Sequence, residues 1–95
     1  MIEILTFHLR PGVEEPAFLA TDKAVQADFA YQQPGLLRRT TAKGEDGNWV
    51  VIDLWSSAEA ADSADQRWGT DPATARFSSM LDRGTVTSAR YHELG

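Results

Sequence analysis

Asp22 is the residue of this chain whose position most suggests chemistry. It falls in a predicted helix from about Val13 to about Gln32, which carries one apolar stripe at spacings of seven and four residues, made by Phe18, Val25 and Phe29. At 100° per residue Asp22 lies inside that stripe, and a carboxylate in an apolar core costs several kcal/mol unless it is paired or protonated. Asp22 is therefore a candidate base for a phenolic or enolic proton, a structural partner for Arg38 or Arg39, or a residue that reaches the open end of a cleft.

Three further polar residues could accompany Asp22. Arg38 and Arg39 are adjacent on an extended segment and must point to opposite faces, so one can enter a cleft and bind Asp22 or an anion. The other then lies in solvent, and the sequence does not say which is which. Gln26 lies at the edge of the Asp22 stripe, where it either offers an amide to a ligand or is a simple boundary residue.

An aromatic group forms the second candidate set. Trp55 ends a strand-like run, where it either touches a ligand or plugs the junction between strand and helix. Asp53 alternates with Trp55 and shares its face, so it is either a satisfied buried acid or part of a cleft. Trp68 and Phe77 follow an alanine-rich segment, whose small side chains either allow close packing or leave an apolar space for a ligand.

Other classes of site and partner are disfavoured. His8 and His92 lack clustered carboxylates and the chain has no cysteine, so we expect no metal site. The net charge of −5 disfavours nucleic acid and anionic membranes. No stretch approaches the length of a membrane helix, and the first residues do not resemble a signal peptide. A cytoplasmic protein with one domain over residues 1–95 is the expectation.

The elements that must position these residues follow the order β-α-β-β-α-β, which is the order of a ferredoxin-like α+β fold with a four-stranded antiparallel sheet. The expected strands are Ile2–Leu9, Leu36–Ala42, Trp49–Trp55 and Thr85–Leu94. The expected helices are Val13–Gln32, a segment from Ser56 or Ser57 to Trp68, and a short helix from Pro72 to about Leu81.

The Trp49–Trp55 run is apolar on both faces and leads into the capping box Ser56-Ser57-Ala58-Glu59. A strand that is apolar on both faces belongs in the middle of a sheet that is covered on both sides. A chain of 95 residues has too few helices to cover both faces. We therefore expect a second copy to cover the other face and form a homodimer.

With these elements placed, the chain resembles the dimeric α/β-barrel superfamily, and within it the antibiotic biosynthesis monooxygenase-like proteins. The resemblance spans nearly the whole chain. It is carried by Phe7-x-Leu9-x-Pro11-Gly12, by Gln33-Pro34-Gly35-Leu36, by Trp55-Ser56-Ser57-Ala58-Glu59-Ala60, and by Asp71-Pro72 followed by Phe77.

The resemblance implies two sheets packed face to face and a ligand cleft between helices and sheet. It implies a cofactor-independent, monooxygenase-like enzyme acting on a small aromatic or polyketide-type molecule. Asp22 and Trp55 would then be catalytic, while Gln26, Arg38, Asp53, Trp68 and Phe77 would contact the ligand. Haem degradation is disfavoured, because the region from Ala58 to Leu81 has no histidine. The alternative is a homodimer without catalysis that binds a small apolar ligand or is purely structural.

Overall fold

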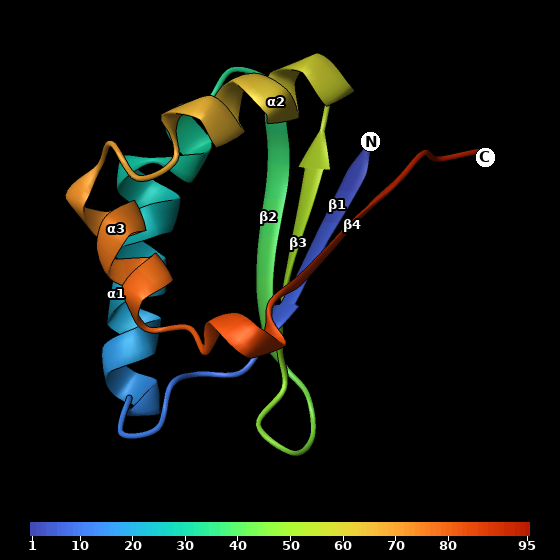
Figure 1. Cartoon of the computed structure of the whole chain (residues 1–95). Helices are drawn as coiled ribbons and strands as arrows, with labels where there is room; N and C mark the ends of the chain where they lie inside the picture. Colours follow the sequence, from blue (N-terminus) through green and yellow to red (C-terminus); the bar gives the residue numbers. More distant parts are fainter.

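The computed structural model describes residues 1–95 and contains the expected β-α-β-β-α-β order, with the second helical region in two parts (Figure 1). The strands are β1 (Ile2–Phe7), β2 (Leu36–Lys43), β3 (Trp49–Trp55) and β4 (Thr87–Tyr91). The helices are α1 (Glu15–Asp28), α2 (Ala58–Arg67) and α3 (Pro72–Ser79), with short 3₁₀ turns at Ala30–Gln32 and Arg83–Thr85. No helix is both long enough and apolar enough to cross a membrane.

The strands form one antiparallel sheet in the order β2-β3-β1-β4. The two strands that the sequence marks as apolar on both faces, β1 and β3, are the central ones, which confirms the ferredoxin-like prediction. The loop between β2 and β3 contains the Asp46-Gly47 turn, whose positive φ angles of 57° and 76° are those of a type I′ turn.

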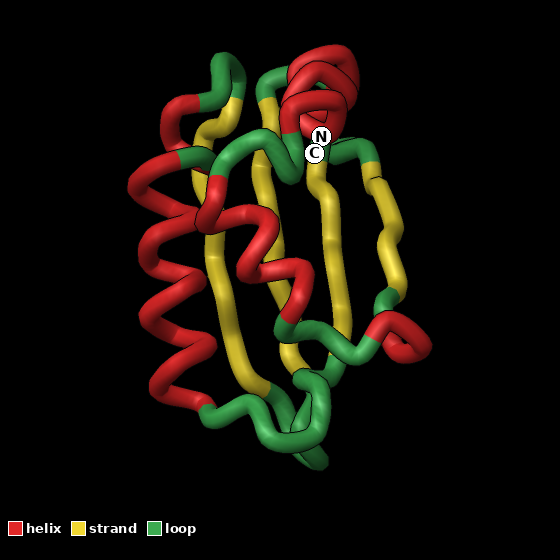
Figure 2. Tube along the Cα trace, turned by 60° about the vertical axis from the view of Figure 1, so that its left-hand side comes forward, coloured by secondary structure: helices red, strands yellow, loops and turns green.

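All three helices lie on one face of the sheet (Figures 1 and 2). Between them and the sheet lies an aromatic core, in which Phe18 contacts Phe7, Trp49 and Phe77 at centroid distances of 4.9–5.7 Å. The opposite face of the sheet carries no helix. The central strands present there a set of apolar side chains, namely Ile2, Ile4, Val50, Ile52 and Leu54.

Several boundaries differ from the sequence expectation. The first helix ends at Asp28 and continues only as a 3₁₀ turn, so its predicted length was too great. The cap of α2 is Ser57, whose hydroxyl accepts a hydrogen bond from the amide of Ala60, whereas Ser56 lies before the helix. The last strand is shorter than predicted, because residues Arg83–Thr85 form a 3₁₀ turn before it.

Gly35 sets the distance between the start of β2 and the start of α2. It has a φ of +89°, and its carbonyl accepts a hydrogen bond from the amide of Ser56 at 2.8 Å. A Cβ atom at Gly35 would meet Cβ of Ala60 at 2.6 Å and Oγ of Ser56 at 2.7 Å. Only glycine satisfies both the backbone angle and the close contact.

We predict that Gly35→Ala lowers the free energy of unfolding by about 2–4 kcal/mol, because strain at positive φ adds to overpacking. Gly12→Ala is the matched control: Gly12 has the same φ of +89°, and a Cβ atom there would have no neighbour within 4 Å. Its cost should be about 1 kcal/mol, from the backbone alone. Denaturant unfolding measures both, and equal costs would contradict a close contact at Gly35.

Candidate functional site

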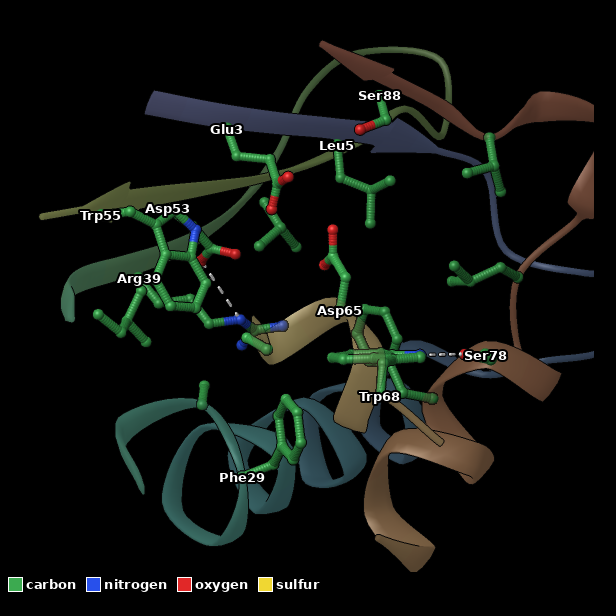
Figure 3. A pocket seen from close by; sticks show the side chains of 17 residues that line it. Glu3, Leu5, Phe29, Arg39, Asp53, Trp55, Asp65, Trp68, Ser78 and Ser88 are labelled. Carbon is green, nitrogen blue, oxygen red and sulfur yellow. Dashed lines mark hydrogen bonds and ion pairs between the residues drawn. The ribbon is translucent and has the colours of Figure 1, made fainter. Parts of the chain in front are cut away.

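A cavity of about 290 Å³ lies between the helices and the covered face of the sheet (Figure 3). Seventeen residues line it, of which eleven are hydrophobic. Every strand contributes to its wall, and so do α2, α3 and the segment that follows α1. The size and the mainly apolar wall are those of a site for a small organic molecule.

Aromatic rings shape the helical side of the cavity. Trp68 lies edge-on to Phe29 and to Phe77, with centroid distances of 5.4 Å and 5.7 Å. Its indole Nε1 donates a hydrogen bond of 2.8 Å to Oγ of Ser78, which fixes the ring (Figure 3). On α2, the side chain at position 64 is only an alanine, so space remains beneath this helix. The alanine-rich segment therefore leaves room at Ala64, while Ala61 packs fully buried against Trp55.

The sheet side of the cavity carries a row of charges that crosses all four strands. The register pairs Arg39 of β2 with Asp53 of β3, and Asp53 with Glu3 of β1. It pairs Glu3 in turn with Arg90 of β4. Two carboxylates thus lie side by side in the middle of the row, and a guanidinium lies at each end.

Arg39 is buried and is held from the helical side by Asp22. Its Nη1 lies 2.8 Å from Oδ1 of Asp22, a close ion pair that lacks hydrogen-bond alignment. Gln26 donates a hydrogen bond of 3.1 Å to the other oxygen of Asp22. Asp22 does not line the cavity, so its burial is explained by the arginine partner that the sequence analysis named as an alternative to a catalytic base.

Arg90 holds the opposite end of the row. Its guanidinium donates to Glu3 at 2.9 Å, to Asp62 at 2.7 Å and to Asp65 at 3.1 Å. These bonds connect the edge strand β4 to β1 and to α2, over the cavity wall that Glu3 and Asp65 help to form. Partial exposure makes each pair weak alone, but the shared guanidinium couples all three.

Asp53 is the least well paired of the cavity carboxylates. Its Oδ1 lies 3.8 Å from Nε of Arg39 and has no hydrogen-bond partner. Burial raises the pKa of Asp53 to about 6, although the positive charge of Arg39 opposes the rise. The negative charges of Glu3, Asp22 and Asp65 reinforce it.

Trp55 supplies an unpartnered donor to the same wall. The residue is 5% exposed, and its Nε1 has no acceptor. Because Trp55 and Asp53 are two positions apart on one strand, they point to the same face, and both line the cavity. A buried indole N–H without a partner is costly, and a ligand atom could satisfy it.

The structure brings together only part of the predicted site. Asp53, Trp55, Trp68 and Phe77 all line the cavity. Asp22, Gln26 and Arg38 do not line it. Arg38 is exposed on the opposite face of the sheet, so Arg39 is the arginine that reaches the cavity.

Sequence reasoning missed Glu3, Asp65 and Arg90. For Glu3 a signal existed, since it alternates with Leu5 and Phe7 on the face that the helices cover. Histidine and carboxylate side chains form no group of three or more that could hold a metal ion.

Asp53→Asn should change stability in a way that depends on pH. A carboxyl with a raised folded-state pKa binds its proton more tightly in the folded state, so its contribution to stability falls as pH rises from about 4 to about 6. The difference in unfolding free energy, variant minus parent, should therefore increase by about 2 kcal/mol as pH rises from about 4 to about 8. Asp46→Asn, in the exposed hairpin turn, should show no such gain; an equal response of both variants would contradict the raised pKa.

Neither the scan against family models nor the search of curated proteins returns a match. Solved structures do match. SnoaB, a cofactor-independent oxygenase from Streptomyces nogalater, is similar with a TM-score of 0.75 and 21% identity, over 99% of this chain and 92% of that chain. A crystal structure of an antibiotic biosynthesis monooxygenase is similar with a TM-score of 0.68 and 13% identity, over 100% of both chains. The chain therefore has the ferredoxin-like fold of the antibiotic biosynthesis monooxygenase-like proteins.

Proposed function

We propose that the cavity is the active site of a monooxygenase-like enzyme that acts without a cofactor on a small aromatic or polyketide-type molecule. The observation that carries this proposal is the cavity itself, which has aromatic walls on the helical side and titratable groups on the sheet side. Such a cavity can hold a flat ring against Trp68 and Phe77 and present its polar edge to Asp53 and Trp55.

The proposed chemistry needs no outside reductant. A phenol and O₂ can give a quinone and water: one oxygen atom enters the ring, and the other leaves with two hydrogens of the phenol. All electrons that reduce O₂ then come from the substrate. The protein's part is to exclude water, orient the ring and promote loss of the phenolic proton, which makes the ring electron-rich.

The predicted site residues take different parts in this proposal. Trp55, Trp68 and Phe77 contact the ring, and Asp53 contacts its hydroxyl edge. Asp22 and Gln26 act one layer further out, where they hold Arg39 at the cavity wall. Arg38 has no part, because it lies on the other face of the sheet.

The similarity to SnoaB supports the proposal, since that protein is described as a cofactor-independent oxygenase. At 21% identity it supports the fold alone, and the lining of the cavity has to carry the rest.

Oxygen uptake with a panel of polyphenols and hydroxylated polycyclic aromatics tests the proposal. We expect at least one compound to consume O₂ well above its rate without protein. Ser88→Trp fills the cavity from the exposed strand β4 and should lower that uptake at least about tenfold. Ser63→Trp makes the same change on the outer face of α2, away from the cavity, and should leave it intact.

Uptake that Ser88→Trp leaves unchanged would contradict an active site in this cavity. Binding of the same compounds without any turnover would instead favour the alternative, a homodimer that binds a small molecule without catalysis. A rise in melting temperature with ligand, lost in Ser88→Trp, would identify that case.

We also propose that a second copy of the chain covers the open face of the sheet. Apart from Thr6, the residues that the central strands present there are aliphatic, and every helix lies on the other side. Ile52, in the middle of β3, remains 37% exposed in the single chain. Such an apolar centre, with Arg38 only on the edge strand β2, is typical of an obligate interface.

Ile52→Lys should dissociate this dimer, because a buried unpaired ammonium costs several kcal/mol and would weaken association about 100-fold or more. Leu19→Lys is the matched control, since Leu19 is 45% exposed on α1 and lies on the helical side. Light scattering after gel filtration gives the mass of each. A dimer that persists in Ile52→Lys, or a monomeric parent protein, would contradict the proposal.

A further inference from the structure

Two neighbouring carboxylates in the charged row have very different partners. Glu3 receives a hydrogen bond of 2.9 Å from Arg90. Asp53 has only Arg39, at 3.8 Å, and Arg39 already forms its close ion pair with Asp22 at 2.8 Å. Asp53 is thus a carboxylate on the cavity wall whose nearest cation is committed elsewhere. Its Oδ1 is buried without a hydrogen-bond partner, and the residue lines the cavity.

The wall also offers a free donor next to this free acceptor. Nε1 of Trp55 has no partner although the residue is only 5% exposed. Figure 3 shows Trp55 and Asp53 on the same wall of the cavity, facing the rings of Trp68 and Phe29. A hydroxyl group donates one hydrogen bond and accepts another, so it can satisfy both protein atoms.

The charge of the surroundings selects against an anion. Around the cavity two guanidiniums, of Arg39 and Arg90, are in ion pairs with five carboxylates, those of Glu3, Asp22, Asp53, Asp62 and Asp65. The excess is negative. A ligand that enters with its own carboxylate or phosphate would be repelled, whereas a neutral ring with a hydroxyl would not.

We propose that the cavity takes a neutral phenol and that Asp53, flanked by Glu3, is the base that receives its proton. The phenolic O–H donates to Oδ1 of Asp53 and its oxygen accepts from Nε1–H of Trp55. In the proton transfer the phenolic O–H bond breaks and a bond from that proton to Oδ1 forms. The electron pair stays on the phenolic oxygen, so the negative charge moves from Asp53 to the ligand, beside Trp55 and the guanidinium of Arg39. This inference rests on the proposed function, which gives that proton transfer its role in the reaction.

The charged groups around Asp53 suit it to this role near neutral pH. Arg39 faces it from β2, Glu3 from β1, Asp22 from α1 and Asp65 from α2. Burial and the three acids make Asp53 a stronger base than an ordinary carboxylate, with a pKa of about 6. It is still ionised at pH 7–8 and can accept a proton there.

Binding of 2-naphthol and of its methyl ether, measured by equilibrium dialysis between about pH 5 and pH 8, tests the inference. Both ligands are neutral over this range, but only the naphthol has a proton to donate. We expect naphthol affinity to rise about tenfold through pH 6 as Asp53 ionises and its charge strengthens the hydrogen bond. Affinity of the ether should not rise. An equal response of both ligands would overturn the inference.

Four variants, one of them a control, sharpen this test. Asp53→Asn should abolish the pH-dependent rise, while Asp46→Asn, the same charge change in the distant hairpin turn, should keep it. Glu3→Gln removes a neighbouring negative charge and should move the midpoint of the rise to lower pH without abolishing it. Trp55→Phe keeps an aromatic ring but removes the N–H, so it should lower the affinity for naphthol more than the affinity for the ether. A rise that survives in Asp53→Asn would overturn the proposal.

The two proposals fail in different ways. If naphthol shows the rise but no aromatic substrate consumes oxygen, the assignment of Asp53 stands and the oxygenase proposal fails. If oxygen uptake occurs without the rise, and its kcat/KM shows no dependence on ionisation near pH 6, the cavity is an active site but Asp53 is not its base.

Discussion

The cavity depends on a guanidinium buried between helix and sheet. Arg39 is 7% exposed, and it pairs with Asp22 of α1 while its side chain lies 5.7 Å from the ring centroid of Phe77 in α3. One side chain of β2 thus contacts both helices that face it. A buried charge keeps its position only while its partner keeps its own, because separation would leave either ion unpaired in a medium of low dielectric. The ion pair therefore fixes where α1 lies over the edge of the sheet.

The ion pair between Arg39 and Asp22 leaves Asp53 poorly paired. Since Arg39 is held by Asp22, it reaches Asp53 only at 3.8 Å, and the pKa of Asp53 stays raised despite the nearby cation. Together with the unpartnered Nε1 of Trp55, this leaves two buried polar atoms unsatisfied on one wall of the cavity. Such atoms lower stability, and proteins tend to keep them where a ligand can satisfy them.

Local patterns predicted most of the fold. The Trp49–Trp55 run has the bounds of β3, and the burial of Asp22 follows from its place in the stripe of α1. The choice between Arg38 and Arg39 could not be predicted. Doubled residues in β2 give both faces the same chemistry, and the register shifts between Leu36 and Arg38.

Local sequence patterns could not predict the charged row, for a different reason. Glu3 and Arg90 are 87 residues apart in the chain, and only the register of β1 against β4 brings them together. Likewise, the position of Trp68 depends on its hydrogen bond to Ser78 in α3, across the break between the two helices. The sequence could suggest which residues face inward, but the partner of each inward charge is a property of the assembled sheet.

The most direct test of this account is a crystal structure of the protein with 2-naphthol at about pH 8. We expect the naphthyl ring to lie against Trp68 and Phe77, with its oxygen within hydrogen-bond distance of Oδ1 of Asp53 and Nε1 of Trp55. A ring bound with its hydroxyl turned away from Asp53, or a cavity that stays empty at saturating naphthol, would contradict it.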